Sequence, residues 1–164
     1  MFYNTIKSDK CKTNQDVSLD IIGKKNFDIF HPTYYSTYFL DKIDYKPFVL
    51  NVHDMIHEKY PELFSRDDKT WLNKRTLIEK AARIIAVSEC TKKDIVSFYP
   101  ETVDKIRVIY HGSSLIQGTV PKISLPGKYL LFTGSRWGYK NFYFFINAIA
   151  SYLRSRNDLF LICT

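Results

Sequence analysis

Residues 83–100 read RIIAVSECTKKDIVSFYP, an apolar run that passes directly into a helical pattern. The first five side chains include two isoleucines and a valine, as is typical of a buried strand. Ser88 and Thr91 are both suitable helix N-caps, and Thr91 has Asp94 three residues on. Pro100 ends the helix, since a proline ring cannot continue helical hydrogen bonding. The stretch therefore predicts a strand followed by a helix.

Short apolar runs of the same kind recur on both sides of this stretch. They predict strands at residues 27–31, 48–52, 106–109, 128–133 and 159–163. Segments with helical periodicity separate several of these runs, and a short helix is expected near residues 17–22. Apolar strands that alternate with helices indicate parallel sheets covered on both faces. The predicted fold class is therefore α/β, with parallel sheet layers.

Apolar stripes predict two further helices. The helix over residues 69–83 has a stripe that Lys74 and Arg75 interrupt, so we expect these two side chains to reach its edge or to face a cleft. Its apolar members are Trp71, Ile78, Ala81 and Ala82. The helix near residues 142–153 has one apolar face, formed by Phe142, Phe145, Ile146, Ile149, Ala150 and Leu153.

The chain changes character at residues 113–127, where Ser, Gly and two prolines occur with little periodicity. This composition is typical of a linker. We therefore expect one domain over residues 1–112 and the start of a second over residues 128–164. Two parallel strands cannot protect their edges or bury their faces, so we expect the second domain to be incomplete and the chain to be a fragment.

Composition narrows the function classes. The chain has 164 residues and a net charge of +7, but its basic residues are dispersed, so we do not expect nucleic-acid binding. Three cysteines without metal-type spacing argue against a disulfide framework or a zinc site and favour a reducing cytoplasm. No apolar run approaches the ~18 residues of a membrane span, so we expect a soluble protein.

The loop after the predicted strand 128–133 is suited to phosphate. Gly134 allows a sharp turn at the end of the strand, and Arg136 and Lys140 lie just before a helix with Asn141 as its expected N-cap. Free backbone N–H groups, the positive end of the helix dipole and two cations would meet there. An arginine can bind two oxygens of a diphosphate at once. An ordinary turn with solvated side chains is the alternative.

A second group of polar residues follows the other predicted strands. His53 and Asp54 end the strand 48–52, at the carboxyl edge where open parallel sheets bind ligands. A histidine there could contact a sugar hydroxyl or a phosphate, carry a proton, or only pack. His53 and His57 have the spacing of helical metal ligands, but a third ligand is missing and no metal is expected. Ser88, Glu89, Gly112, His31 and His111 are weaker candidates for lining the same cleft.

The order of these motifs resembles the retaining glycosyltransferases of family 4. It runs from His53-Asp54 through residues 86–92 and 106–112 to residues 130–136 and 139–141. The resemblance covers residues 27–164 and implies a GT-B architecture, with two Rossmann-like domains facing each other across a cleft. It implies that the N-terminal domain binds the acceptor, that the C-terminal domain binds the nucleotide sugar, and that neither metal nor another cofactor is needed.

The resemblance also implies roles for individual residues. Arg136 and Lys140, with Gly134 in the same loop, match the residues that hold the donor diphosphate, and His53 matches the histidine on the acceptor side. His53 is therefore the candidate catalytic residue, while Asp54, Ser88, Glu89 and Gly112 are candidates for lining the cleft. The glycine-rich first loop and the downstream paired glutamates of the family are absent. By this comparison, residues 1–112 are the later part of the acceptor domain and residues 128–164 begin the donor domain.

The Tyr-Lys-Asn version of the donor loop resembles a bacterial surface-polysaccharide subset that contains many mannosyltransferases. We therefore expect the parent enzyme to transfer a sugar, with mannose the leading candidate, from a nucleotide-diphosphate sugar to a glycan or lipid-linked acceptor. The basic surface would favour the inner face of a membrane. The isolated chain is expected to be inactive or nearly so.

Two alternatives remain open. The chain could be a non-catalytic remnant that serves as a binding or assembly module, with an exposed sheet edge that favours a homo-oligomer. It could also derive from another GT-B enzyme, such as a sugar-nucleotide epimerase or an inverting transferase.

Overall fold

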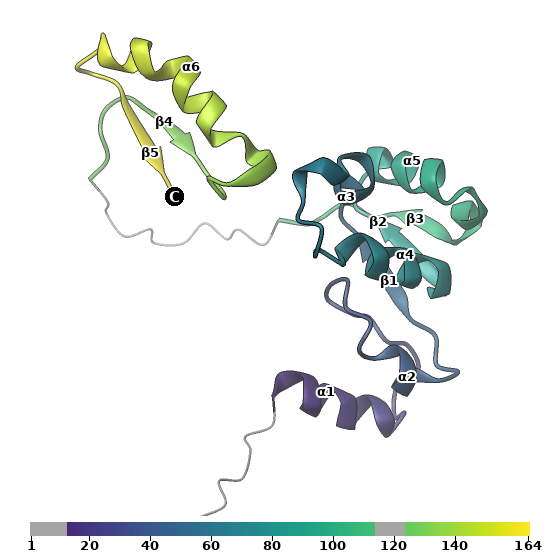
Figure 1. Cartoon of the computed structure of the whole chain (residues 1–164). Helices are drawn as coiled ribbons and strands as arrows, with labels where there is room; N and C mark the ends of the chain where they lie inside the picture. Colours follow the sequence, from purple (N-terminus) through teal and green to yellow (C-terminus); the bar gives the residue numbers. More distant parts are fainter. Residues whose placement is uncertain (1–12, 114–123) are drawn as a thin grey trace, which may run out of the picture. The chain divides into compact units, whose positions relative to one another are not determined.

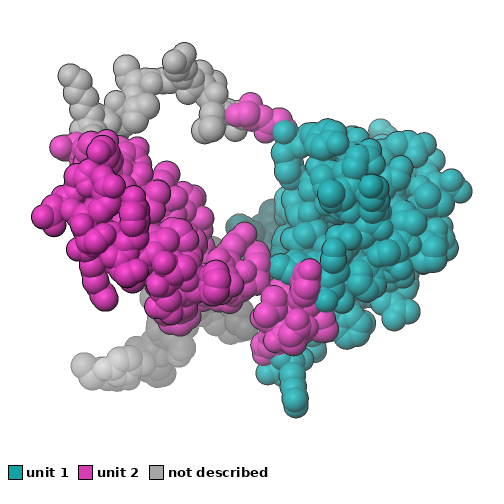
Figure 2. Space-filling view, turned by 90° about the horizontal axis from the view of Figure 1, so that it is seen from above, with its two compact units in different colours: residues 1–59, 66–111 teal, residues 60–65, 112–164 magenta. Residues whose placement is uncertain are grey.

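The chain forms two compact units, which Figure 1 shows as ribbons and Figure 2 in different colours. The computed structural model describes residues 13–113 and 124–164. Unit 1 comprises residues 1–59 and 66–111, and unit 2 comprises residues 60–65 and 112–164. Most of the predicted linker lies outside the described residues.

Unit 1 is built on a parallel sheet whose strands follow chain order. β1 (Val49–Val52), β2 (Arg83–Ala86) and β3 (Ile106–Val108) pair in the order β1-β2-β3. Their pairings are all parallel, which confirms the α/β class predicted from the sequence. The run at residues 27–31 contributes only one isolated bridge, from Phe30 to Phe48. Pro32 follows closely and has no N–H with which to extend the ladder.

Seven helical segments precede β3 in the described part of the chain, and all but η1 belong to unit 1 (Figure 1). They are α1 (Asn14–Gly23), α2 (Leu40–Ile43), α3 (Ile56–Lys59), η1 (Pro61–Leu63), α4 (Thr70–Lys80), α5 (Glu89–Phe98) and η2 (Pro100–Lys105). α1 is longer than the predicted helix 17–22 because Thr13 and Asp16 form a capping box at its start. α5 begins at the predicted cap Ser88, whose side chain accepts a hydrogen bond from the Thr91 N–H.

One face of the sheet is buried and the other is partly open. α4 and α5 make successive crossovers in the same direction, so right-handed connections place both helices on the same face. There Leu50, Ile84 and Ile106 join Leu77 of α4 and Ile95 of α5 in one buried cluster.

The opposite face carries Asn51, Ile85 and Arg107, which lie in register on the three strands. None of these three residues is fully buried. The expectation that helices cover both faces is therefore wrong for the described residues of unit 1.

α4 buries a different stripe from the predicted one. Ile78 and Ala81 are buried as expected, but the Trp71 side chain is 46% exposed. Lys74 is fully buried, whereas Arg75 is exposed and pairs with Glu79 at 2.9 Å. Lys74 replaces Trp71 on the buried face because its ammonium group finds oxygen partners inside unit 1.

Unit 2 contains β4 (Tyr129–Phe132), η3 (Gly138–Lys140), α6 (Phe142–Arg154) and β5 (Phe160–Cys163). β4 and β5 form a parallel pair. Phe132 packs against Phe142 and Phe145 of α6, with ring centroids 4.8 and 5.7 Å apart. The six predicted apolar positions of this helix are its least exposed ones, although no described residue of unit 2 is fully buried.

No helix in the described parts of the chain is both long enough and apolar enough to cross a membrane.

Candidate active site

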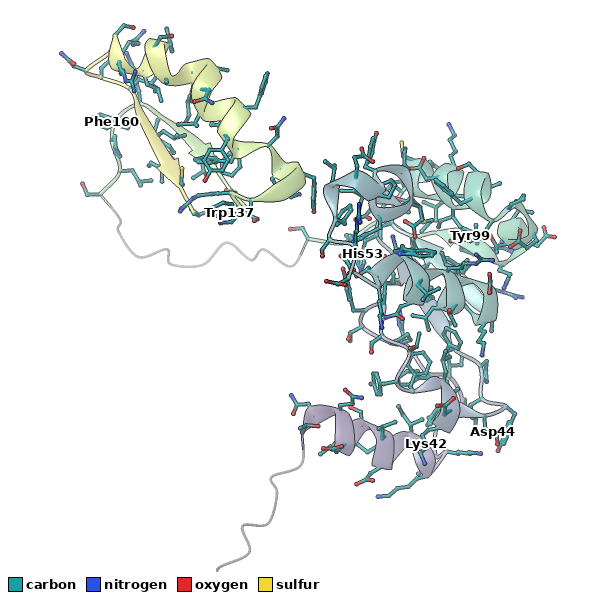
Figure 3. All side chains as sticks on the ribbon, in the orientation of Figure 1. Lys42, Asp44, His53, Tyr99, Trp137 and Phe160 are labelled. Carbon is teal, nitrogen blue, oxygen red and sulfur yellow. The ribbon has the colours of Figure 1, made fainter. Side chains whose placement is uncertain are left out.

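The main chain at His53 is held by side chains from two other segments of unit 1. His53 directly follows β1 (Figure 3). Its N–H donates to the Tyr35 hydroxyl at 2.9 Å, and its carbonyl accepts from the Thr91 hydroxyl at 3.2 Å. Burial raises the pKa of the Tyr35 phenol, so this group stays neutral. The backbone that carries the His53 ring is therefore fixed on both sides.

The buried side chain of Lys74 holds the main chain at Asp54, the residue after His53. Its ammonium group donates to the Asp54 carbonyl at 3.0 Å and to the Glu58 carboxylate at 2.9 Å. It also lies 5.0 Å from the centroid of the Tyr35 ring. The Glu58 side chain is only 5% exposed, so the ion pair is almost fully desolvated. Removal of either partner from such a pair would leave the other charge buried without compensation and would destabilise the fold.

Asp54 itself faces outward. Its side chain is 53% exposed, and its Oδ1 accepts from the Ile56 N–H at 3.1 Å, which starts α3. The sequence predicts no helix in this segment, yet one helical turn fits between Asp54 and Pro61. Asp54 therefore shapes the turn and also presents a carboxylate oxygen to solvent.

Two further histidines lie at the carboxyl edge of the same sheet. The His111 ring, beyond β3, stacks on the His53 ring with centroids 5.6 Å apart and planes 23° apart. His31, after the Phe30 bridge, has its Nε2 3.2 Å from the Asn51 Oδ1. These contacts bring together side chains that lie as many as 58 positions apart in the sequence.

Ser88 reaches this edge only through Thr91. The two hydroxyls are 3.0 Å apart, and the Thr91 hydroxyl continues to the His53 carbonyl. Ser88 therefore acts as the cap of α5, while Glu89 is an exposed residue of its first turn. Gly112 belongs to unit 2, and a Cβ built on it would meet no atom within 4 Å. Nothing in the backbone requires glycine at position 112.

The predicted phosphate loop lies in unit 2 between β4 and α6. Its glycines have positive φ angles, 123° at Gly134 and 67° at Gly138. Arg136 and Lys140 are both exposed, and the Lys140 ammonium lies 4.8 Å from the Tyr139 ring centroid. The Ser135 hydroxyl accepts from the Trp137 N–H at 3.2 Å, which tightens the loop (Figure 3 labels Trp137).

The start of α6 differs in one respect from the prediction. Asn141 is the N-cap, but it has a left-handed backbone with φ of 55°, and its side chain makes no capping hydrogen bond. Its own N–H instead donates to the Gly138 carbonyl at 3.1 Å. The N–H groups of the first turn of α6 are thus not capped by Asn141 and remain suited to an anion.

Three residues at the unit 1 site were not predicted as site residues from the sequence. Tyr35 acts through a contact to a distant main-chain N–H, which no local pattern reveals. Lys74 interrupts the apolar stripe of its helix, but the stripe does not predict its contact with the Asp54 carbonyl. Asn51 leaves a signal, because it is the only polar residue in the otherwise apolar strand β1. A polar side chain within a buried strand indicates a hydrogen-bond partner or a functional site.

A metal site is not formed by the described residues, among which no three potential ligands from His, Cys, Asp and Glu gather. His57 lies in α3, and its Nε2 is 3.4 Å from an oxygen of Asp68. His53 instead stacks on His111. His53 and His57, which have the spacing of helical metal ligands, therefore contact different residues and form no shared site.

The family model described as Glycosyltransferase Family 4 matches residues 16–115, which span most of unit 1. Among curated proteins, no relative matches the chain.

Proposed function

Because the chain belongs to glycosyltransferase family 4, we propose that it serves the transfer of a sugar from a nucleotide-diphosphate donor to a hydroxyl of a glycan or lipid-linked acceptor. The fold is compatible with this activity, since open parallel sheets bind ligands beyond the carboxyl ends of their strands. In this proposal, residues 1–112 serve the acceptor and residues 128–164 begin the donor domain of a GT-B architecture, joined by a linker at residues 113–127.

The donor end of the proposal rests on the loop from Gly134 to Lys140. Positive φ angles at Gly134 and Gly138 turn the chain sharply, and α6 begins without a side-chain cap. Arg136 and Lys140 are two exposed cations in the same loop, before the start of α6. This combination supports binding of a diphosphate, which carries negative charge on several oxygens.

Charge neutralisation is the proposed chemical contribution of this loop. During transfer, the bond from the sugar C1 to the diphosphate oxygen breaks, and its electron pair stays on that oxygen. The acceptor oxygen bonds to C1, and its proton passes to the departing diphosphate. Cations and N–H groups aimed at the leaving oxygens stabilise the charge that develops there. His53 would bind the acceptor hydroxyl, with Asp54, Ser88, Glu89 and Gly112 as further residues of the cleft.

The finer assignment follows the resemblance of the donor loop. We place the chain with retaining hexosyltransferases of bacterial surface-polysaccharide synthesis, with mannose as the sugar and the inner face of a membrane as the site of action. Mixing the chain with vesicles of anionic and of neutral lipid, followed by sedimentation, tests the last point. Binding to neither vesicle would contradict a membrane location.

Nucleotide binding tests the donor assignment. Calorimetric titration of the whole chain with UDP and with GDP should show binding of at least one of them. Arg136→Ala and Lys140→Ala should each weaken that binding about tenfold or more, since a charge-assisted hydrogen bond contributes about 1.5–3 kcal/mol.

Arg154→Ala is the matched control for Arg136→Ala. Arg154 is exposed in the last turn of α6, the helix that follows the loop. It should leave the dissociation constant unchanged. Equal effects of the two arginine variants, or no binding of either nucleotide, would contradict the donor assignment and favour a non-catalytic assembly module. Light scattering would then test self-association through the edges of the β4-β5 pair.

A further inference from the structure

The first turn of α6 in unit 2 carries four aromatic side chains in a row. Two of them, Phe142 and Phe145, pack against Phe132 of β4. The other two, Tyr143 and Phe144, are 57% and 70% exposed. A helix that is apolar all round is normally buried on every side, in a large core or in a membrane. The outer side of this turn therefore suggests a further contact.

The exposure of Phe144 follows from the direction in which its side chain points. Successive residues of a helix lie about 100° apart around its axis, so Phe144 lies about 200° from Phe142. Phe142 faces the β4-β5 pair, and Phe144 faces away from it. A strand that paired with β4 or β5 would extend the sheet on the side of Phe142. Such a strand would leave Phe144 exposed.

Trp137 joins these outer rings. It lies in the loop before α6, where Figure 3 labels it, and its side chain is 73% exposed. Its ring meets the Tyr143 ring edge-on, with centroids 5.9 Å apart. We call Trp137, Tyr143 and Phe144 the aromatic patch. Single exposed apolar side chains are normal, whereas those that gather on one surface mark a contact with a protein or a membrane.

The charge of the surrounding segment has one predominant sign. Residues 124–164 contain five basic residues and one acidic residue. The acidic residue, Asp158, forms ion pairs with two of the basic ones. Arg136 and Lys140 lie on either side of Trp137 in the sequence, and both are exposed. This part of unit 2 therefore attracts an anionic partner.

An anionic lipid surface fits this combination best. Trp and Tyr rings are enriched where the hydrocarbon of a bilayer meets water, and nearby Lys and Arg side chains bind anionic headgroups. A second copy of the chain would bring the cations of both molecules together, and like charges across an interface repel each other. Interfaces between proteins are also depleted of lysine.

We propose that the aromatic patch is the surface through which unit 2 contacts a bilayer of anionic lipid. The rings of Trp137 and Phe144 enter the headgroup region, and the positive charge of unit 2 draws the patch to the bilayer. This inference rests on the proposed transferase function with its membrane location, and it adds the face of the chain that makes the contact.

Fluorescence of Trp137 tests the proposal on the whole chain. The sequence has two tryptophans, so Trp71→Phe leaves Trp137 as the reporter. Vesicles that contain phosphatidylglycerol should shift the Trp137 emission to shorter wavelength, and brominated acyl chains in these vesicles should quench it. Vesicles of phosphatidylcholine alone should have a weaker effect. Added salt should weaken binding to the anionic vesicles, because it screens the attraction.

Serine variants in the Trp71→Phe background show whether the aromatic patch makes the contact. Phe144→Ser should weaken binding to the anionic vesicles about tenfold or more, because a buried aromatic side chain is lost. Tyr143→Ser should act in the same direction and keeps the test valid if Phe144→Ser fails to fold. Tyr45→Ser is the matched control, since Tyr45 is 74% exposed but belongs to unit 1. It should leave binding unchanged.

Three results would overturn the proposal. The first is an unchanged Trp137 signal with anionic vesicles, even if the chain sediments with them, because another face would then bind. The second is an equal loss of binding in Tyr45→Ser and Phe144→Ser. The third is a dimer in light scattering that Phe144→Ser converts to a monomer, which would assign the patch to a second copy.

Nucleotide binding separates this inference from the function on which it rests. If one of these three results is found while UDP or GDP still binds through Arg136, only the membrane-contacting face is wrong. If nucleotide binding is absent as well, the proposed transferase function fails too.

Discussion

Lys74 lies fully inside unit 1, where its ammonium group is shielded from water and depends on Glu58 and on the Asp54 carbonyl. Lys74→Met should lower the free energy of unfolding by about 3–5 kcal/mol, because it leaves the Glu58 carboxylate buried without its partner. Urea denaturation measures this change. Lys80→Met, at an exposed position of the same helix, should change stability by less than about 0.5 kcal/mol.

A double variant tests the reason for that loss. Lys74→Met combined with Glu58→Leu replaces the buried pair with apolar groups and should recover much of the stability that Lys74→Met loses. Losses that simply add would show that the two side chains do not act as a pair.

Gly134 is the residue of unit 2 whose backbone most clearly requires glycine. Its φ of 123° lies where side-chain-bearing residues are rarely found. Gly134→Ala should destabilise unit 2 by about 1–3 kcal/mol through backbone strain alone, since a Cβ there would meet no atom within 4 Å. Thermal unfolding followed by Trp137 fluorescence, with Trp71→Phe as the common background, reports this change. Gly127→Ala, which also has open space but no such φ, should not lower the midpoint.

At the scale of the element, the start of α4 predicts a pH dependence. The Thr70 hydroxyl, followed by the Thr70 N–H, lowers the pKa of the Asp68 carboxyl. The N–H contact measures 2.8 Å. A carboxyl whose pKa is lowered by folding adds stability above its unfolded pKa of about 4, and this contribution is lost as the pH falls through the folded pKa.

The difference between wild type and Asp68→Asn should therefore be larger at pH 6 than at pH 3. Urea midpoints at about these two pH values measure it. Loss of the charge should cost less than about 1 kcal/mol at the higher pH, since the amide oxygen of the variant can still accept from the Thr70 N–H. Asp28→Asn, at an exposed position away from any helix start, is the matched control. A difference that is the same at both pH values would contradict the role of the Asp68 charge.

Most elements could be predicted because their signals are local. β2 and α5 follow from one apolar run and one N-cap, and the apolar face of α6 follows from its periodicity. The buried face of α4 could not be predicted, because it includes Lys74. Its ammonium group is stable in the interior only through hydrogen bonds to the Asp54 carbonyl and the Glu58 carboxylate. The site shows the same contrast. The sequence predicts that His53 follows β1 and that Ser88 follows β2, and the structure has them there. The contacts of Tyr35 and Asn51 depend on how the segments meet.

At the scale of the whole molecule, the two units differ in how much apolar surface they bury. Among the described residues, all fifteen members of the buried hydrophobic cluster lie between Ile22 and Ile106, within unit 1. Amides of β1, β2 and β3 should therefore exchange hydrogen more slowly than those of β4, α6 and β5, since local opening costs less where few side chains are buried. Hydrogen exchange followed by mass spectrometry compares them. Equal protection would contradict this difference.

The order of the strands in unit 1 also bears on how the chain folds as it leaves the ribosome. Each strand pairs with the one made just before it, β2 with β1 and β3 with β2. No strand of this sheet has to wait for a partner that is still to be translated. The sheet can therefore grow in step with synthesis, one strand and one crossover helix at a time, at the ~5–20 residues per second of translation.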